Sequence, residues 1–150
     1  MQPSNTMFAR LELATGQEAL AHGEVEAAHR AFIKSVAIFD ASPRFQPTRT
    51  LAAALLARTE SALGRHPAAL ERADEAVQRA RALWSAGSAA GLPHSAWLGQ
   101  ALIAQAVVRE AAGQGDTARH SAEEALPHLQ ATMGEQAPET REAVAFLSAR

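Results

Sequence analysis

Residues 16–36 read GQEALAHGEVEAAHRAFIKSV, and a segment of similar design returns twice further along the chain. The second copy is ARTESALGRHPAALERADEAV at residues 57–77, and the third is AVVREAAGQGDTARHSAEEAL at residues 106–126. Superposing Gly23, Gly64 and Gly113 aligns the three copies without a gap. An internal repeat of this kind indicates a chain built from stacked units. The recurring columns are Gly16/Ala57/Ala106, Ala28/Ala69/Ala118, Phe32/Ala73/Ala122, Ser35/Ala76/Ala125 and Val36/Val77/Leu126.

Each copy predicts two helices joined at its glycine, because a glycine just past a helix end adopts the left-handed conformation of a C-cap. Small residues that face one another let the two helices approach to about 8–9 Å, the low end of the normal range. One pair buries only half of its apolar surface, so the pairs must stack to make a continuous core. The sequence therefore predicts helix pairs at about residues 8–39, 48–84 and 95–130, and a last helix at about residues 139–149.

The connections between the predicted pairs share a proline followed by a hydroxyl residue that can cap the next helix. Pro127 predicts a local bend near the end of its helix, because a proline in a helix interior costs about 3 kcal/mol. The run SAGSAAG at residues 85–91 has no periodicity and predicts a mobile loop. The three connections are Pro47-Thr48, Pro93-His94-Ser95 and Pro138-Glu139-Thr140.

Composition limits the class of protein. Alanine supplies 37 of the 150 residues, whereas the chain holds one lysine, Lys34, and no tyrosine or cysteine. The abundance of the best helix former, and the scarcity of the residues that strands favour, predict an all-α fold. The lack of cysteine excludes disulfides and cysteine-based zinc sites.

Charge and hydropathy argue against two kinds of partner. A net charge of −2 gives no electrostatic basis for binding nucleic acid or an anionic membrane surface. No apolar run reaches the length of about 18 residues that a membrane span needs, and the first ten residues lack the pattern of a signal peptide. We therefore expect a cytoplasmic protein that binds neither nucleic acid nor membrane.

The repeat resembles the tetratricopeptide repeat (TPR) family, whose pattern of a small residue, a hinge glycine and then Ala-x3-Phe is matched by Gly16, Gly23, Ala28 and Phe32. The run MGEQAPET at residues 133–140 is similar to the end of a repeat in the kinesin-light-chain-like branch. The resemblance covers nearly the whole chain. It implies a single domain, residues 1–150, folded as a right-handed α-solenoid of three helix pairs plus a C-terminal closing helix, about seven helices in all.

The same resemblance implies that a partner binds the inner, concave face of the first helix of each pair. This face is mostly apolar, which suits an amphipathic helix or an extended peptide with hydrophobic anchors. A clamp for the carboxylate of a chaperone tail is disfavoured, because Lys34 is the only lysine in the chain. The predicted groove residues are Arg10, Leu13, Gln17, Leu20, Leu51, Ala54, Arg58, Ser61, Gln100, Ile103, Val107 and Glu110.

No residue pattern predicts catalysis or metal binding. The six histidines contain no i, i+4 pair, so we expect them to face solvent or cap helices. The carboxylates are scattered, no serine has a neighbouring base motif, and Gly113-Gln114-Gly115 lacks the strand and the lysine of a phosphate loop. We therefore expect no enzymatic activity, no cofactor and no metal.

Aromatic and apolar residues outside the repeat have two interpretations each. Trp84 and Trp97 are predicted to pack the loop between the second and third pairs, and the alternative is that they anchor a partner. Val144, Phe146 and Leu147 of the last helix either shield the end of the stack or form a dimer contact.

These observations predict a non-catalytic protein–protein interaction module that binds a peptide or helix of a partner on its concave face. The alanine- and arginine-rich repeats resemble the tails of bacterial regulators and Ser/Thr kinases, which implies the C-terminal part of a larger bacterial signalling protein. Two alternatives stay open. One is a structural protein that self-assembles through its solenoid ends, and the other is a helical bundle that binds a metal or small molecule through its histidines.

Overall fold

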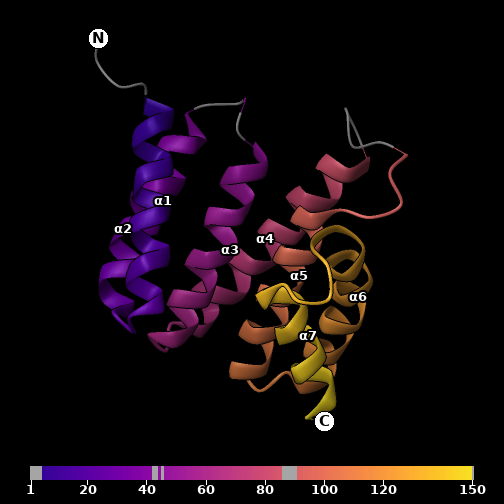
Figure 1. Cartoon of the computed structure of the whole chain (residues 1–150). Helices are drawn as coiled ribbons and strands as arrows, with labels where there is room; N and C mark the ends of the chain where they lie inside the picture. Colours follow the sequence, from indigo (N-terminus) through magenta and orange to yellow (C-terminus); the bar gives the residue numbers. More distant parts are fainter. Residues whose placement is uncertain (1–4, 42–43, 45, 86–90, 150) are drawn as a thin grey trace.

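The computed structural model describes residues 5–41, 44, 46–85 and 91–149, and these residues form seven α-helices and no β-strand (Figure 1). The all-α class expected from the composition is confirmed. The helices are α1 Asn5–Ala21, α2 Val25–Asp40, α3 Gln46–Ala62, α4 His66–Ser85, α5 Ala96–Ala111, α6 Gly115–Met133 and α7 Pro138–Ser148.

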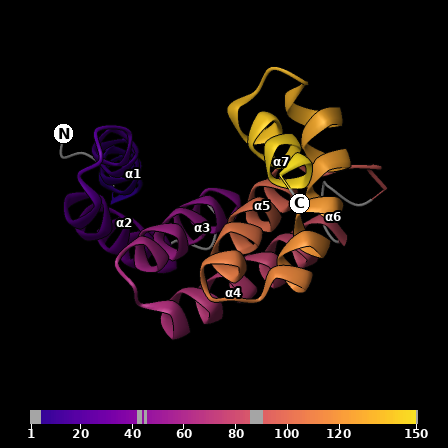
Figure 2. The same cartoon turned by 90° about the horizontal axis from the view of Figure 1, so that it is seen from below.

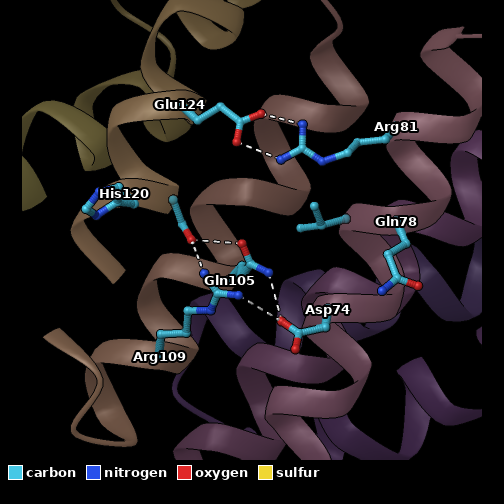
Figure 3. A pocket seen from close by; sticks show the side chains of 9 residues that line it. Asp74, Gln78, Arg81, Gln105, Arg109, His120 and Glu124 are labelled. Atoms are coloured by element: carbon cyan, nitrogen blue, oxygen red, sulfur yellow. Dashed lines mark hydrogen bonds and ion pairs between the residues drawn. The ribbon is translucent and has the colours of Figure 1, made fainter. Parts of the chain in front are cut away.

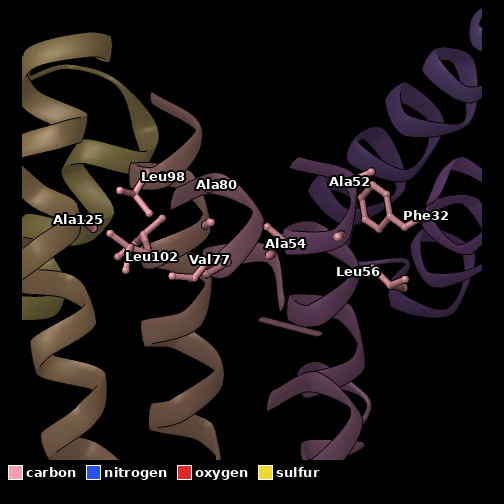
Figure 4. Packing of buried hydrophobic residues seen from close by; sticks show 14 of the residues in the cluster. Phe32, Ala52, Ala54, Leu56, Val77, Ala80, Leu98, Leu102 and Ala125 are labelled. Atoms are coloured by element: carbon pink, nitrogen blue, oxygen red, sulfur yellow. The ribbon is translucent and has the colours of Figure 1, made fainter. Parts of the chain in front are cut away.

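The helices pack against one another in chain order, from α1 against α2 to α6 against α7. In addition, α3 lies directly against α5. Figure 2 shows that the helices follow an arc, with α1, α3, α5 and α7 along its inner side and α2, α4 and α6 along its outer side. Buried apolar side chains follow the same arc, and Figure 4 shows the part of this core between Phe32 and Ala125.

Each of the three helix pairs turns at its glycine through the same hydrogen-bonded cap. Gly23 has a φ of +76°, and its N–H donates to the carbonyl oxygen of Leu20 at 3.1 Å. The next N–H along the chain donates to the carbonyl oxygen of Ala19 at 2.8 Å, which completes a Schellman motif. Gly64 and Gly113 repeat both bonds, with φ of +78° and +82°. The predicted C-caps at the three glycines are confirmed.

The recurring columns lie in the interior of the helix stack. Every residue in these columns is buried except Leu126, which is partly buried against the core. Ala28, Ala69 and Ala118 are fully buried at the start of the second helix in each pair. Small side chains at such positions let the two helix axes lie close together. The burial that helix packing requires of these columns is confirmed.

The first pair fills its centre differently from the other two. The fully buried ring of Phe32 on α2 lies against Gly16 on α1. A Cβ atom on Gly16 would stand 2.5 Å from Cε1 of this ring, well inside contact distance. The side chains at these two equivalent positions therefore vary together in size, because the one large residue, Phe32, faces a glycine. The equivalent residues, all fully buried, are Ala57 and Ala73 in the second pair and Ala106 and Ala122 in the third.

Gly16→Ala is expected to lower the free energy of unfolding by about 1–3 kcal/mol, because the added methyl group overlaps the Phe32 ring. Phe32→Ala removes the buried ring and is expected to cost about 3–5 kcal/mol. In the double variant the methyl group has room, so its loss of stability should be well below the sum of the two. Urea denaturation of the wild type and the three variants, followed by far-UV circular dichroism, measures the coupling. Additive losses would show that Gly16 and Phe32 do not share one space.

Two of the three predicted hydroxyl caps lie elsewhere. Ser95 is the N-cap of α5 as predicted, and its hydroxyl accepts a backbone N–H of the first turn at 3.2 Å. Thr48 and Thr140 instead lie inside α3 and α7, because these helices begin at Gln46 and Pro138. The missing N–H of proline costs little in a first turn, where that N–H has no helical partner, so a helix can begin at or before its proline.

The helix that contains Pro127 does not end near it, because α6 continues to Met133. A proline removes one hydrogen bond from a helix interior. His128 and Leu129, directly after the proline, are nevertheless buried, and they pack at Gly99 on α5. This contact with α5 holds the last turns of α6 in place.

The loop predicted to be mobile falls mostly on residues 86–90, which lie outside the described residues. Trp84, just before it, packs as predicted between the second and third pairs. Its Nε1–H donates to the carbonyl oxygen of Leu92 at 2.7 Å, and its ring stands edge-on to the ring of His128, with centroids 4.9 Å apart. Trp97 is more accessible, with 37 % of its surface exposed.

Candidate functional site

A hollow of about 460 Å³ lies between α1, α3 and the start of α7. All three helices belong to the inner side of the arc (Figure 2). We call this feature the inner hollow. Its lining residues are Gln17, Leu20, Ala21, Leu55, Arg58, Pro138, Glu139 and Glu142.

Helical spacing brings these side chains to one place. Residues three or four apart share a face of an α-helix. Gln17 is followed at these spacings by Leu20 and Ala21 on the last turn of α1, and Leu55 by Arg58 on α3. On α7 the lining residues come from the first two turns, at residues 138–142. The hollow is therefore built by turns of regular helix rather than by a loop.

An ion pair closes one side of the inner hollow. Nη1 of Arg58 donates to Oε1 of Glu142 at 2.8 Å, and Nη2 donates to the second carboxylate oxygen of Glu142. Such a two-point pairing of guanidinium and carboxylate fixes the relative orientation of the two groups. It joins α3 to α7, two helices that are far apart in the chain. The partly buried pair thus helps to hold α7 at the edge of the hollow.

The lining of the inner hollow combines apolar surface with charged groups. Leu20, Leu55, Ala21 and Pro138 supply apolar surface, and Leu20 and Leu55 are only partly buried by the core. Among the described residues that line this hollow there is no serine, threonine or histidine, and the charged groups are those of Arg58, Glu139 and Glu142. Apolar surface with a few charged groups at its edge is typical of a site for a peptide or helix.

The structure separates the predicted groove residues into buried and accessible ones. Leu13, Ala54, Ser61 and Ile103 are at most 7 % exposed and lie in the interior. Neighbouring helices, such as α3 and α5, cover these four residues, so little of their surface is open to a partner. The residues that keep exposed or partly exposed surface are Arg10, Gln17, Leu20, Leu51, Arg58, Gln100, Val107 and Glu110.

Only three of the predicted residues, Gln17, Leu20 and Arg58, meet in the inner hollow. The residues from α5 do not line it. The contribution of α7 was missed, because the last helix was expected only to close the stack or to form a dimer contact. One signal could have revealed it: Pro138-Glu139-Thr140 follows the same pattern as the connections that precede α3 and α5.

A second hollow, of about 320 Å³, lies between α4, α5 and α6, and its lining is polar (Figure 3). We call it the polar pocket. Its lining residues are Asp74, Val77, Gln78, Arg81, Gln105, Arg109, His120, Ser121 and Glu124.

Most polar groups of this pocket pair with one another. Gln105 Nε2 donates to Asp74 Oδ1 at 2.8 Å, Ser121 Oγ donates to Gln105 Oε1 at 2.8 Å, and Arg109 Nη1 donates to Ser121 Oγ at 2.9 Å. These bonds link the three helices that surround the pocket. The polar residues that line the pocket therefore have a structural role, because their hydrogen bonds join α4, α5 and α6.

The outer edge of the polar pocket is a second two-point ion pair. Arg81 on α4 donates to both carboxylate oxygens of Glu124 on α6, at 2.5 and 2.6 Å. The hydrogen bonds from Arg81 lower the pKa of the Glu124 carboxyl, and the same bonds raise the pKa of the Arg81 guanidinium. Both groups are thus held in their charged forms and paired.

His128 contradicts the prediction that the histidines face solvent or cap helices. It is 6 % exposed, and its Nδ1 accepts the backbone N–H of Ser95 at 3.0 Å. Its ring also stands edge-on to the ring of His94, with centroids 5.4 Å apart. The tryptophan and the α5 start that surround His128 come from other parts of the chain, so no local pattern could place it in the interior.

Burial lowers the pKa of His128, the charges of His94 and Arg81 lower it further, and the charge of Glu124 raises it. Protonation would also place a hydrogen on Nδ1, where the Ser95 N–H now donates. The folded chain therefore favours the neutral form of His128.

Stability is expected to fall as the medium becomes acidic. The pKa of His128 is lower in the folded chain than its ordinary value of about 6.5, so the unfolded chain binds the proton first. The stability linked to this histidine is fully present above that value and is lost as the pH falls through the lower, folded value. His128→Asn keeps an acceptor for the Ser95 N–H but does not titrate, so its free energy of unfolding should depend less on pH.

Urea denaturation at pH values on both sides of 6.5 measures the slope of the free energy of unfolding against pH for each protein. His22→Asn, which removes an exposed histidine, is the matched control and should keep the wild-type slope. Equal slopes for His128→Asn and the wild type would contradict the role given to His128.

Comparison with family models, curated proteins and solved structures gives no match for this chain. Within the described ranges, no helix has the length and apolar character needed to cross a bilayer. The described histidines, aspartates and glutamates form no group of three or more that could hold a metal ion.

Proposed function

We propose that this protein is a non-catalytic interaction module whose inner side binds a peptide or a helix of a partner protein. In this proposal the three helix pairs form a TPR-like right-handed solenoid, and α7 follows them as a further inner helix. The shared Schellman turns at Gly23, Gly64 and Gly113 support this arrangement, because units with the same turn and the same buried columns stack in a regular way.

The inner hollow is the observation that carries the proposal. It brings side chains from α1, α3 and α7 together around accessible apolar surface on Leu20 and Leu55. The polar pocket is a weaker candidate, because most of its donors and acceptors already pair with one another. A partner that places an apolar side chain in the inner hollow would remove this surface from water, and burial of one such side chain contributes about 1.5–3 kcal/mol.

Selection of a phage-displayed peptide library on the purified chain tests this function. Peptides that bind the inner hollow should bind the Gln17→Trp variant at least about tenfold more weakly than the wild type. Gln17 is exposed and lines the hollow, so the indole of the variant would fill it. Fluorescence anisotropy of the labelled peptides measures the affinity, and far-UV circular dichroism checks that the variant is folded.

The neighbouring residue offers a matched control. Glu18 is also exposed on α1 but does not line the inner hollow, so Glu18→Trp should leave peptide affinity within about twofold of the wild type. A library from which no peptide is enriched, or peptides that bind Gln17→Trp as well as the wild type, would overturn the proposed function.

A second candidate function, self-assembly through the ends of the helix stack, is supported by the positions of exposed apolar residues. Phe8 and Leu11 on α1 and Ile33 on α2 are at least 45 % exposed at the first pair, and Val144 on α7 is 42 % exposed at the other end. Apolar surface of this kind often marks a contact between proteins. An end-to-end contact between two different surfaces joins copies into an open chain.

Sedimentation velocity over a wide range of protein concentration tests self-assembly. The wild type should sediment faster as concentration rises, and Leu11→Glu should abolish the change by placing a charge in the contact. Gln78→Glu adds the same charge at an exposed position in the middle of α4 and should behave as the wild type. A wild type that stays monomeric at every concentration would exclude this function.

A further inference from the structure

We infer that the segment bound in the inner hollow carries a lysine or arginine next to its apolar anchor, and that Glu139 receives this cation. The inference rests on the proposed function, since it names the chemistry of the partner at the same hollow. It assigns the inner hollow two parts. One is an apolar surface formed by Leu20, Ala21, Leu55 and Pro138, and the other is the carboxylate of Glu139.

The charges around the inner hollow do not balance. Among the described residues, Arg58 is the only basic one that lines it, and its guanidinium is bound at two points by Glu142. Glu139 is the remaining charged residue of the lining. An acidic group beside apolar surface attracts a basic group of a partner and disfavours an acidic one.

The hydrogen bonding of Glu139 supports the same conclusion. Its Oε2 atom is buried and has no hydrogen-bond partner among the described residues, although the residue as a whole is partly exposed. A buried polar atom without a partner is unfavourable, so a donor from a bound segment would be stabilising there. The terminal torsion of a glutamate is broad, which allows either oxygen to turn toward the hollow.

A purely structural role for Glu139 makes a different prediction. An acidic residue in the first turn of a helix stabilises the helix through the dipole, and Glu139 lies in the first turn of α7. If this were its only role, Glu139→Gln would lower the stability of the fold and leave the charge preference of bound peptides unchanged. The two roles are therefore separated by the composition of the selected peptides.

The experiment repeats the peptide selection on the wild type, Glu139→Gln and Glu139→Lys. Peptides selected on the wild type should contain an apolar residue and, within one or two turns of helix, a lysine or arginine. Peptides selected on Glu139→Lys should instead contain aspartate or glutamate near the apolar residue. The affinity of a wild-type-selected peptide should fall about tenfold on Glu139→Gln, as expected for loss of a hydrogen bond between charged groups.

Two controls complete the design. Glu135→Gln changes an exposed glutamate just before α7 that does not line the hollow, and it should leave the affinity unchanged. A version of the selected peptide with glutamine in place of its basic residue should bind the wild type and Glu139→Gln equally.

The outcomes distinguish this inference from the proposed function. Selected peptides that bind Gln17→Trp more weakly than the wild type occupy the inner hollow. If such peptides carry no basic residue, or are acidic, they would overturn the inference and leave the proposed function standing. Peptides that bind Gln17→Trp and Glu139→Gln as tightly as the wild type bind elsewhere on the chain. They would overturn both the inference and the proposed function.

Discussion

Close contact between the two helices of each pair is the constraint on which the rest of the structure depends. The alanines at the three equivalent positions Ala28, Ala69 and Ala118 are fully buried, and each allows its helix to approach the one before it. A larger residue fits only where the residue that faces it on the other helix is smaller, as Gly16 is opposite Phe32. Because interiors are packed to high density, this matching of sizes sets the spacing of the helices in each pair.

Polar contacts join the pairs to one another across this core of small side chains. Arg49, only 5 % exposed, donates to Asp40 of α2 at 2.6 Å and to Glu75 of α4 at 3.1 Å. Within the second pair, the buried carboxylate of Glu60 on α3 accepts from Arg72 on α4 at 2.6 Å. Buried charges of this kind need partners in a defined geometry, so they favour one arrangement of the helices over others. The same logic applies at the inner hollow, where the Arg58–Glu142 pair holds α7 near α3.

The features predicted well are those that depend on neighbours in the chain. A hinge glycine is recognised from its place between two periodic segments, because the hydrogen bonds of the cap involve residues within one turn. The burial of the recurring columns follows from helical periodicity in the same way. Accessibility was harder to predict, because residues such as Ile103 and Ala54 share the apolar character of a binding face and are nevertheless covered by adjacent helices. Apolar character alone therefore does not distinguish a residue on a binding face from one that adjacent helices cover.

The sequence by itself determined that the chain is helical, where its pairs turn and which small residues lie between the helices, because these properties follow from backbone conformation and side-chain size. The tertiary structure decided which of the apolar residues stay accessible, that α7 lines the inner hollow together with α1 and α3, and that His128 lies buried against Trp84 and the start of α5. These features join segments far apart in the chain. Their geometry depends on the angle at which each helix packs on the next, and no local pattern records that angle.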